Sequence, residues 1–265
     1  MITDITIGQY FPGTSPVHRL DPRIKILLTF IYIVMIFMAN GILGFAVSAV
    51  FLFSAVRISG IPFKNMVRGL KSVLFIIAFT GIFNLFMVPG DKLFSIGPLT
   101  ASVQGGKMAI MMIVRVFFLI TGTTLLTFTT SPIRLTDGIE NILKPFSRFG
   151  VPAHELAMMM SIALRFIPTL IEETDKIMKA QSARGADFEN GGLVKRAKSF
   201  VPILVPLFIS AFRRADDLAV AMECRCYRGG EGRTRLVQLK CGKIDVVGIL
   251  FCLLFLAFVI ISRFI

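Results

Sequence analysis

The sequence predicts an all-α integral membrane protein, in which a bundle of about five transmembrane helices carries long cytoplasmic helices. Three observations lead to this fold class. Apolar residues make up 55% of the 265 residues, which is above the level of soluble domains. Several long apolar runs carry almost no charge. A long charged block with helical periodicity lies between the fourth and the fifth of these runs.

The apolar runs define the predicted spans. Asp21-Pro22 precedes the first run and predicts a helix start, because Asp caps free N–H groups and Pro fits the first turn. Asn40-Gly41 separates the first two runs. In chain order the predicted spans are residues 24–38, 42–56, 73–88, 108–128 and 246–261. Several are shorter than the roughly 20 residues that cross a bilayer, so we expect flanking residues to extend them.

The first part of the charged block predicts two helices. A short helix begins at Ser131-Pro132 and stops before Pro145. A long helix begins at Pro152, and Pro168 is expected to kink it because proline removes a backbone hydrogen bond.

A third helix is predicted from about residue 193 to about residue 228, with bends near Pro202 and Pro206. The preceding helix is expected to end at Gly185, because glycine readily adopts the left-handed conformation that follows many helices. On the third helix, Arg213 stands four residues before Asp217, and this spacing predicts an ion pair between the two side chains.

The chain therefore divides into residues 1–128 with four spans, the charged block 129–243, and residues 244–265 with the last span. Lys and Arg are frequent in 57–71, in 129–243 and before the first span, whereas 89–107 holds only Lys92 and Lys107 against Asp91. The positive-inside rule then places the N-terminus and the charged block in the cytoplasm. We expect a multi-pass protein of a prokaryotic plasma membrane. Its net charge of +13 indicates contact with anionic lipid rather than nucleic acid.

No catalytic, cofactor-binding or metal-binding residue is predicted. Cys224-x-Cys226 lacks a nearby His and the usual zinc spacing, so small reduced thiols are the better interpretation. His18 and His154 stand alone.

Arg115 lies inside the fourth predicted span, where a charge is costly. It is expected to contact protein or backbone carbonyls, although the sequence names no partner.

The most informative feature is a pair of arginines, each at the predicted end of a long helix. The two segments are Ala183-Arg184-Gly185 and Cys224-Arg225-Cys226. A guanidinium has a permanent charge and a rigid fork of donors, and small neighbours let a partner approach closely. Each segment could also be an ordinary solvated helix end.

These segments resemble the T component of energy-coupling factor (ECF) transporters, the family that includes membrane subunits of cobalt and nickel importers. Matching residues are 18–25, 163–168, 180–185, 213–215, 221–227 and 233–234. In that family two Ala-Arg-Gly motifs engage two ATPase subunits. Here Cys224 and Cys226 replace Ala and Gly in the second motif. Docking is expected to survive because Cys is small, but the helix stop is less secure, and Gly229-Gly230 is an alternative end.

The resemblance implies an energy-coupling subunit that links ATP hydrolysis by two ATP-binding-cassette (ABC) subunits to vitamin or metal-ion uptake through a substrate-capturing membrane subunit, the S component. The chain itself lacks a Gly-x-x-x-x-Gly-Lys-Ser/Thr loop, so it is not predicted to be an enzyme, and ATP is expected on the partners. A conventional ABC importer permease and a membrane enzyme are the alternatives. The substrate, the stoichiometry, and whether the subunit is shared by several S components stay open.

Overall fold

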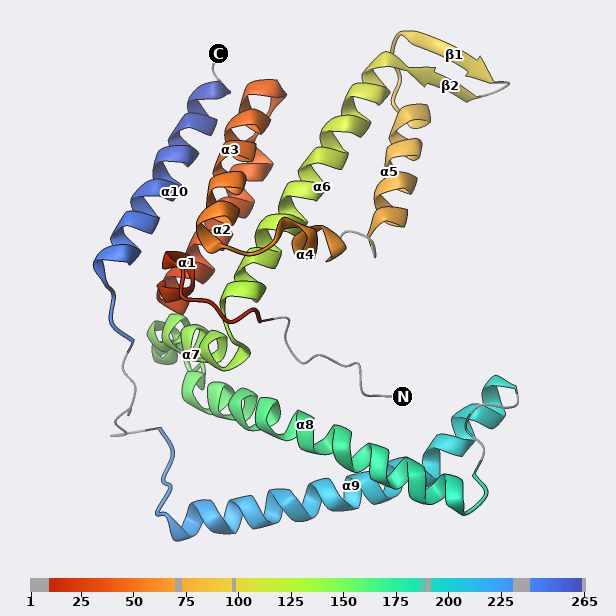
Figure 1. Cartoon of the computed structure of the whole chain (residues 1–265), viewed down its shortest axis with the longest axis vertical. Helices are drawn as coiled ribbons and strands as arrows, with labels where there is room; N and C mark the ends of the chain where they lie inside the picture. Colours follow the sequence, from red (N-terminus) through yellow and green to blue (C-terminus); the bar gives the residue numbers. More distant parts are fainter. Residues whose placement is uncertain are drawn as a thin grey trace. The chain divides into compact units, whose positions relative to one another are not determined.

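The structure is a computed structural model that describes residues 10–69, 73–96, 99–186, 188, 192–230 and 239–263. Most of the described residues are helical, which confirms the predicted all-α class. The chain separates into two compact units (Figure 1). The larger unit contains the described residues up to 138 and those from 239 onward, and the smaller unit contains residues 139–230.

In the larger unit four long helices pack side by side as a bundle (Figure 1). They are α2 (Pro22–Met38), α3 (Gly41–Ser59), α6 (Val103–Thr129) and α10 (Lys243–Ser262). The shorter helices of this unit are α1 (Pro16–Arg19), α4 (Phe63–Arg68) and α5 (Leu74–Met87). The helix α5 packs mainly along α6. Asp21 caps α2 as predicted, since its carboxylate accepts the Arg23 N–H at 2.9 Å.

Buried polar contacts join the ends of the bundle helices. The Lys25 ammonium of α2 donates to the carbonyl of Thr129 at 2.9 Å and to the hydroxyl of Thr130 at 3.1 Å. The backbone N–H of Asp21 donates to the Asp245 carboxylate of α10 at 2.8 Å. Since a buried polar group without a partner costs free energy, these contacts fix which helix ends meet.

Four described helices are long and apolar enough to cross a membrane by length and composition, namely α3, α6, α10 and, in the smaller unit, α8 (Ala153–Ala183). The helices α2 and α5, which match two further predicted spans, have 17 and 14 residues. We expect α8 in the cytoplasm, yet it meets this criterion of length and composition. The reason is that most of its charged residues lie in its second half, which leaves an apolar first half. The count of five spans stays a prediction.

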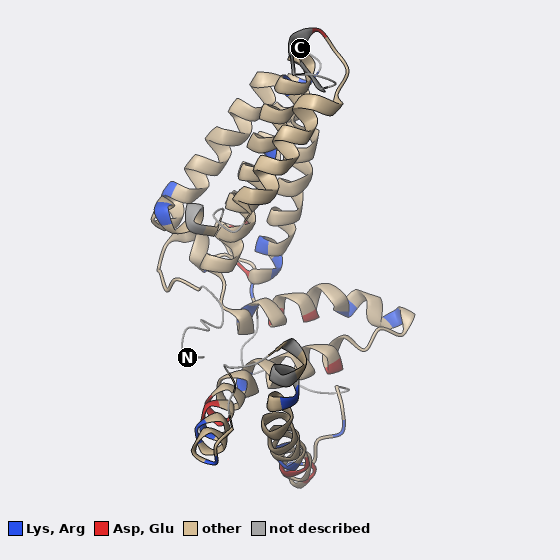
Figure 2. Cartoon of the chain, turned by 90° about the vertical axis from the view of Figure 1, so that its right-hand side faces the viewer, with Lys and Arg blue, Asp and Glu red and all other residues tan. Residues whose placement is uncertain are grey.

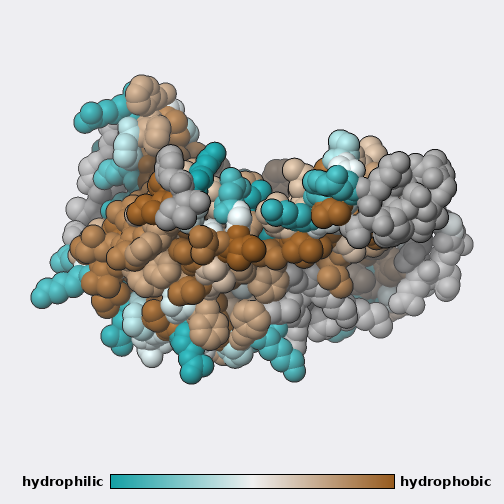
Figure 3. All heavy atoms as spheres, turned by 90° about the horizontal axis from the view of Figure 1, so that it is seen from above, coloured by the Kyte–Doolittle hydropathy of each residue, from teal (hydrophilic) through white to brown (hydrophobic). Residues whose placement is uncertain are grey.

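The outer faces of these helices are apolar. Figure 3 shows continuous areas of hydrophobic side chains on the face that it views. Large apolar side chains on α2, α3 and α5, such as Phe30, Phe53 and Phe75, are exposed in the isolated chain. Exposed apolar surface of this extent indicates a lipid environment, in agreement with the predicted membrane protein.

One element of the larger unit was not predicted. The segment before α6, for which the sequence suggests no regular element, forms an antiparallel hairpin of β1 (Lys92–Ile96) and β2 (Leu99–Ser102). The helix α6 then begins at Val103, earlier than expected, because the Ser102 hydroxyl caps it by accepting the Gly105 N–H at 2.9 Å. Local side-chain capping of this kind is independent of apolar periodicity.

The structure identifies the partner of Arg115. Its guanidinium donates to the carbonyl of Ala39 at 3.0 Å and lies 5.7 Å from the centre of the Phe45 ring. Ala39 caps the C-terminal end of α2, where backbone carbonyls lack partners within the helix. The expected structural contact with a backbone carbonyl is therefore confirmed.

The smaller unit is built mainly from two long helices, and Figure 2 shows that charged residues are frequent on it and sparse along the bundle. The helix α7 (Pro132–Leu143) and the 3-10 segment η2 (Lys144–Phe149) lead into α8, and α9 (Leu193–Cys224) follows. The predicted short helix before Pro145 is thus confirmed. Both α8 and α9 continue through their internal prolines.

The helices α8 and α9 pack against each other in opposite directions. Arg214 of α9 pairs with Glu173 of α8, and the Gln181 amide at the end of α8 donates to the Pro202 carbonyl near the start of α9 at 3.3 Å. The predicted Arg213–Asp217 pair is wrong: both side chains are exposed, and no ion pair joins them within the described chain. The ion pair in this region is made instead by the adjacent Arg214, which reaches Glu173 on α8, whereas Arg213 and Asp217 are both exposed to solvent, where a pair on one helix stabilises little.

Candidate docking site at two helix ends

The first candidate arginine lies at the end of α8. The last helical residue is Ala183, and Arg184 follows as the C-cap. Gly185 has a φ of +89°, and its N–H donates to the Ser182 carbonyl at 3.0 Å. The Ala186 N–H donates to the Gln181 carbonyl, also at 3.0 Å. This is a Schellman ending, which explains why glycine suits position 185.

The second candidate arginine lies at the end of α9 in the same geometry. Arg225 is the C-cap, the Cys226 N–H donates to the Glu223 carbonyl at 2.8 Å, and the Tyr227 N–H donates to the Met222 carbonyl at 3.0 Å. Cys226 adopts a φ of +56° without being glycine. The expected helix to about residue 228 and the alternative end at Gly229-Gly230 are therefore wrong.

The helix α9 ends at Cys224 because two backbone hydrogen bonds satisfy carbonyls of its last turn. These bonds form whether the left-handed residue that follows is Gly or Cys. A non-glycine residue in this conformation costs about 1–2 kcal/mol. Cys226 is the only such residue in the described chain. From the sequence, Cys226 was expected to make the helix end less well defined. In the structure the helix still ends at this point, and Cys226 adopts the strained left-handed conformation.

Both helix ends present the arginine to the outside. All six candidate residues are exposed: Ala183, Arg184, Gly185, Cys224, Arg225 and Cys226. Neither guanidinium forms a hydrogen bond or an ion pair with a residue that the structure describes. Each end thus offers a cation with unused donors beside the partly negative end of a helix.

The two ends are far apart. Because the end of α8 lies beside Pro202, the distance from Arg184 to Arg225 follows the length of α9 beyond that proline. About 23 residues at 1.5 Å each correspond to roughly 35 Å. One small partner groove cannot enclose both arginines, so the arrangement suits two separate grooves.

The two histidines, which the sequence left isolated, have structural partners. The His154 ring nitrogen lies 3.1 Å from the Glu140 carboxylate, which connects the start of α8 to α7. His18 contacts the Ser15 hydroxyl at 2.7 Å and the Phe11 carbonyl at 3.0 Å.

Three of the cysteines are exposed free thiols: Cys224, Cys226 and Cys241. Within the described ranges no three His, Cys, Asp or Glu residues are grouped to hold a metal ion.

Replacing Cys226 with Gly is expected to stabilise the end of α9. Gly removes the left-handed penalty and keeps both backbone hydrogen bonds, so we expect a gain of up to about 1 kcal/mol in detergent-solubilised protein. Cys226→Val should lose at least as much, because β-branched residues resist this conformation. Cys224→Ala is the control for loss of a thiol. Thermal unfolding measures all three, and a Val variant as stable as the Gly variant would contradict the assignment.

The comparisons with known proteins agree with the resemblance. The family described as cobalt transport protein matches residues 13–236. The energy-coupling factor transporter transmembrane protein EcfT of Thermosediminibacter oceani is 58% identical over 262 residues, which cover 99% of both chains. The EcfT proteins of Ruminiclostridium cellulolyticum and Bacillus subtilis are 54% and 49% identical over 265 and 240 residues, covering 100% and 90% of this chain and 99% and 91% of theirs.

The matches extend over both units and include the ends of α8 and α9. A relative more than half identical along its full length shares the fold and the general role of the chain. The chain belongs to the family of energy-coupling factor transporter transmembrane proteins, which are membrane subunits of transporters.

Proposed function

We propose that this subunit transmits the movement of two ABC ATPases to a substrate-capturing S component, and that Arg184 and Arg225 each dock into one ATPase. ATP binding and hydrolysis would shift the ATPases, and α8 and α9 would pass the shift on. The captured substrate would be a vitamin or a metal ion. The site carries no cofactor of its own in this proposal, since the partners bind ATP.

The repeated helix ending is the observation that carries this proposal. Two helices end in the same hydrogen-bond pattern, each with an exposed arginine at the same place. Two equivalent ends suit two equivalent acceptor grooves, in which a carboxylate or a helix C-terminal carbonyl would receive the guanidinium. If these were only ordinary solvated helix ends, nothing would require both the same hydrogen-bond pattern and the same residue, arginine, at the two places.

An apolar surface on the same helices suits the S component. Several large side chains of α8 and α9 are exposed in the isolated chain: Met159, Met160, Phe200, Leu204, Phe208 and Phe212. Soluble surfaces seldom carry so many apolar side chains on two adjacent helices. In the proposed complex this surface packs against the apolar exterior of the S component, while the charged helix ends serve the ATPases.

Photo-crosslinking tests the assignment of partners. A photoreactive phenylalanine in place of Ser182 or Glu223, both exposed beside the arginines, should crosslink to an ATPase subunit in the assembled complex. The same group in place of Phe208 should crosslink to the S component. Crosslinks from positions 182 and 223 to the S component alone would contradict the proposed docking.

The proposed orientation places the N-terminus and both helix ends in the cytoplasm. The native thiols Cys224 and Cys226 should then react with an impermeant maleimide only after the cells are permeabilised. In a variant without native cysteines, Asp91→Cys, which lies beside the hairpin, should react in intact cells. Labelling of both sites from one side would overturn this topology.

A further inference from the structure

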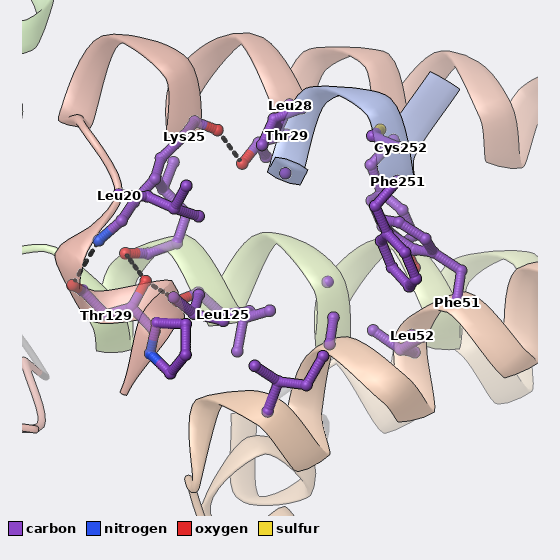
Figure 4. A pocket seen from close by; sticks show the side chains of 18 of the residues that line it. Leu20, Lys25, Leu28, Thr29, Phe51, Leu52, Leu125, Thr129, Phe251 and Cys252 are labelled. Atoms are coloured by element: carbon purple, nitrogen blue, oxygen red, sulfur yellow. Dashed lines mark hydrogen bonds between the residues drawn. The ribbon is translucent and has the colours of Figure 1, made fainter. Parts of the chain in front are cut away.

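The bundle of the larger unit contains a cavity whose lining includes none of the six candidate docking residues. Its volume is about 380 Å³, which lies in the range of ligand pockets, about 300–1,000 Å³. Residues of α1, α2, α3, α6 and α10 line it, so all its walls belong to one unit. Figure 4 shows the side chains that surround it, with Lys25 and Thr129 on one side and Phe51, Phe251 and Cys252 on another.

The walls of the cavity are almost entirely apolar. Leu28, Leu52 and Leu125 contribute aliphatic surface, and the rings of Phe51 and Phe251 stack with centroids 5.5 Å apart. The lining residues Ile58 and Val247 are exposed, so the cavity opens toward the apolar exterior of the bundle. An empty cavity would lose dispersion contacts along its walls. The surrounding medium of a membrane bundle supplies acyl chains that fill such a space.

Basic residues are adjacent in the chain to the cavity lining at one end of the bundle. Three lining residues, Leu20, Ile58 and Ile244, each have an exposed basic neighbour in the chain: Arg19, Arg57 and Lys243, respectively. All three lie at the bundle end where α2 and α10 begin and α3 and α6 finish. None of the three takes part in an ion pair within the described chain.

Two carboxylates at this end, those of Asp21 and Asp245, accept hydrogen bonds from backbone N–H groups of the protein, although Oδ2 of Asp21 is buried without a hydrogen-bond partner. Asp21 accepts from the Arg23 backbone and lies 3.3 Å from its guanidinium, and Asp245 accepts the N–H groups of Asp21 and Gly242 at 2.8 and 2.7 Å. The buried Lys25 donates to carbonyl and hydroxyl oxygens and has no carboxylate within 4.0 Å. This end of the cavity therefore lacks anions relative to its cations.

We propose that the cavity binds an anionic phospholipid, with one acyl chain between α2, α3 and α10 and the phosphate at the rim formed by Arg19, Arg57 and Lys243. The acyl chain itself gives no selectivity, because bilayer tails are as apolar as the cavity walls. Selectivity comes from the rim, since each basic residue near an anionic headgroup contributes about fivefold in affinity. The bound lipid would hold α10 against α2 and α3.

Tryptophan fluorescence tests this site, because the chain contains no Trp. Phe251→Trp places a reporter on the cavity wall, and Phe53→Trp places a matched reporter on the exposed face of α3. The full chain is reconstituted in phosphatidylcholine vesicles with increasing fractions of phosphatidylglycerol brominated on its acyl chains. Quenching at position 251 should saturate at a low fraction, whereas quenching at position 53 should rise in proportion to the fraction.

The rim is tested in the Phe251→Trp background. Replacing Arg19, Arg57 and Lys243 together with Gln should raise the half-saturating fraction at least tenfold. Replacing Lys179, Lys198 and Arg213, three exposed basic residues of the smaller unit, should leave it unchanged. Proportional quenching at position 251, or equal saturation by brominated phosphatidylcholine, would overturn the proposal. Phe51→Trp serves as a second cavity reporter if Phe251→Trp does not fold.

Discussion

The double variant Arg184→Ala, Arg225→Ala should lose both copurification with the ATPase pair and substrate uptake. Truncating one partner of a buried charged contact costs about 2–5 kcal/mol, because the other partner is left without its counter-charge. Even the lower value corresponds to roughly 30-fold weaker docking at each end. Each single variant should keep one ATPase contact and therefore lose uptake more completely than copurification.

Because the two helix ends lie roughly 35 Å apart, the losses of binding free energy in the single and double variants can be compared quantitatively. Sites so far apart, with no shared partner groups, have nearly additive effects on binding. The free-energy loss of the double variant should equal the sum of the two single losses. Marked non-additivity would indicate that one partner spans both ends, contrary to the two-groove assignment.

Two controls separate docking from loss of charge. Arg213→Ala removes an exposed cation from α9 twelve residues before Arg225, away from the helix end, and should behave as wild type. Arg184→Lys and Arg225→Lys should recover only part of the binding, because Lys lacks the planar fork of donors. Copurification and uptake are measured for every variant. Wild-type behaviour of the double Ala variant in both assays would refute the coupling role.

Gly122→Ala should destabilise the bundle strongly, although Ala normally favours a helix over Gly by about 1 kcal/mol. A Cβ at position 122 would lie 2.1 Å from a ring carbon of Tyr32 on α2. The ring cannot move aside freely, because its hydroxyl donates to the Phe118 carbonyl at 2.8 Å in a buried position. Overpacking costs about 1–3 kcal/mol, and loss of the buried hydrogen bond adds about 1–3 kcal/mol. The clash therefore outweighs the helix preference.

Gly106→Ala is the matched control on the same helix. Its added Cβ would lie 3.7 Å from the nearest Leu85 atom, an ordinary contact, so its melting temperature in detergent should be unchanged or higher. The double variant Gly122→Ala, Tyr32→Ala should lose less stability than the sum of the two single losses, since the clashing ring is gone. If Gly122→Ala melted at the wild-type temperature, the close approach of α2 and α6 would be wrong.

Local chemistry determined much of this protein from sequence alone. Apolar runs identified the bundle helices, Asp21 and Gly185 marked a helix start and a helix end, and the arginine segments led to the correct family. These features depend on the next few residues or on transfer into lipid, so a single chain reveals them. The docking role of the arginines remains a proposal.

Only the tertiary structure decided which distant groups meet. Arg115 donates to the Ala39 carbonyl, Arg214 pairs with Glu173 on the neighbouring helix, and the cavity is lined by residues of α1, α2, α3, α6 and α10. The structure also decided the left-handed conformation of Cys226, because the sequence allowed several ends for α9. Contacts between residues far apart in the chain depend on how helices pack, and packing is set by the shapes of whole helix faces rather than by local preference.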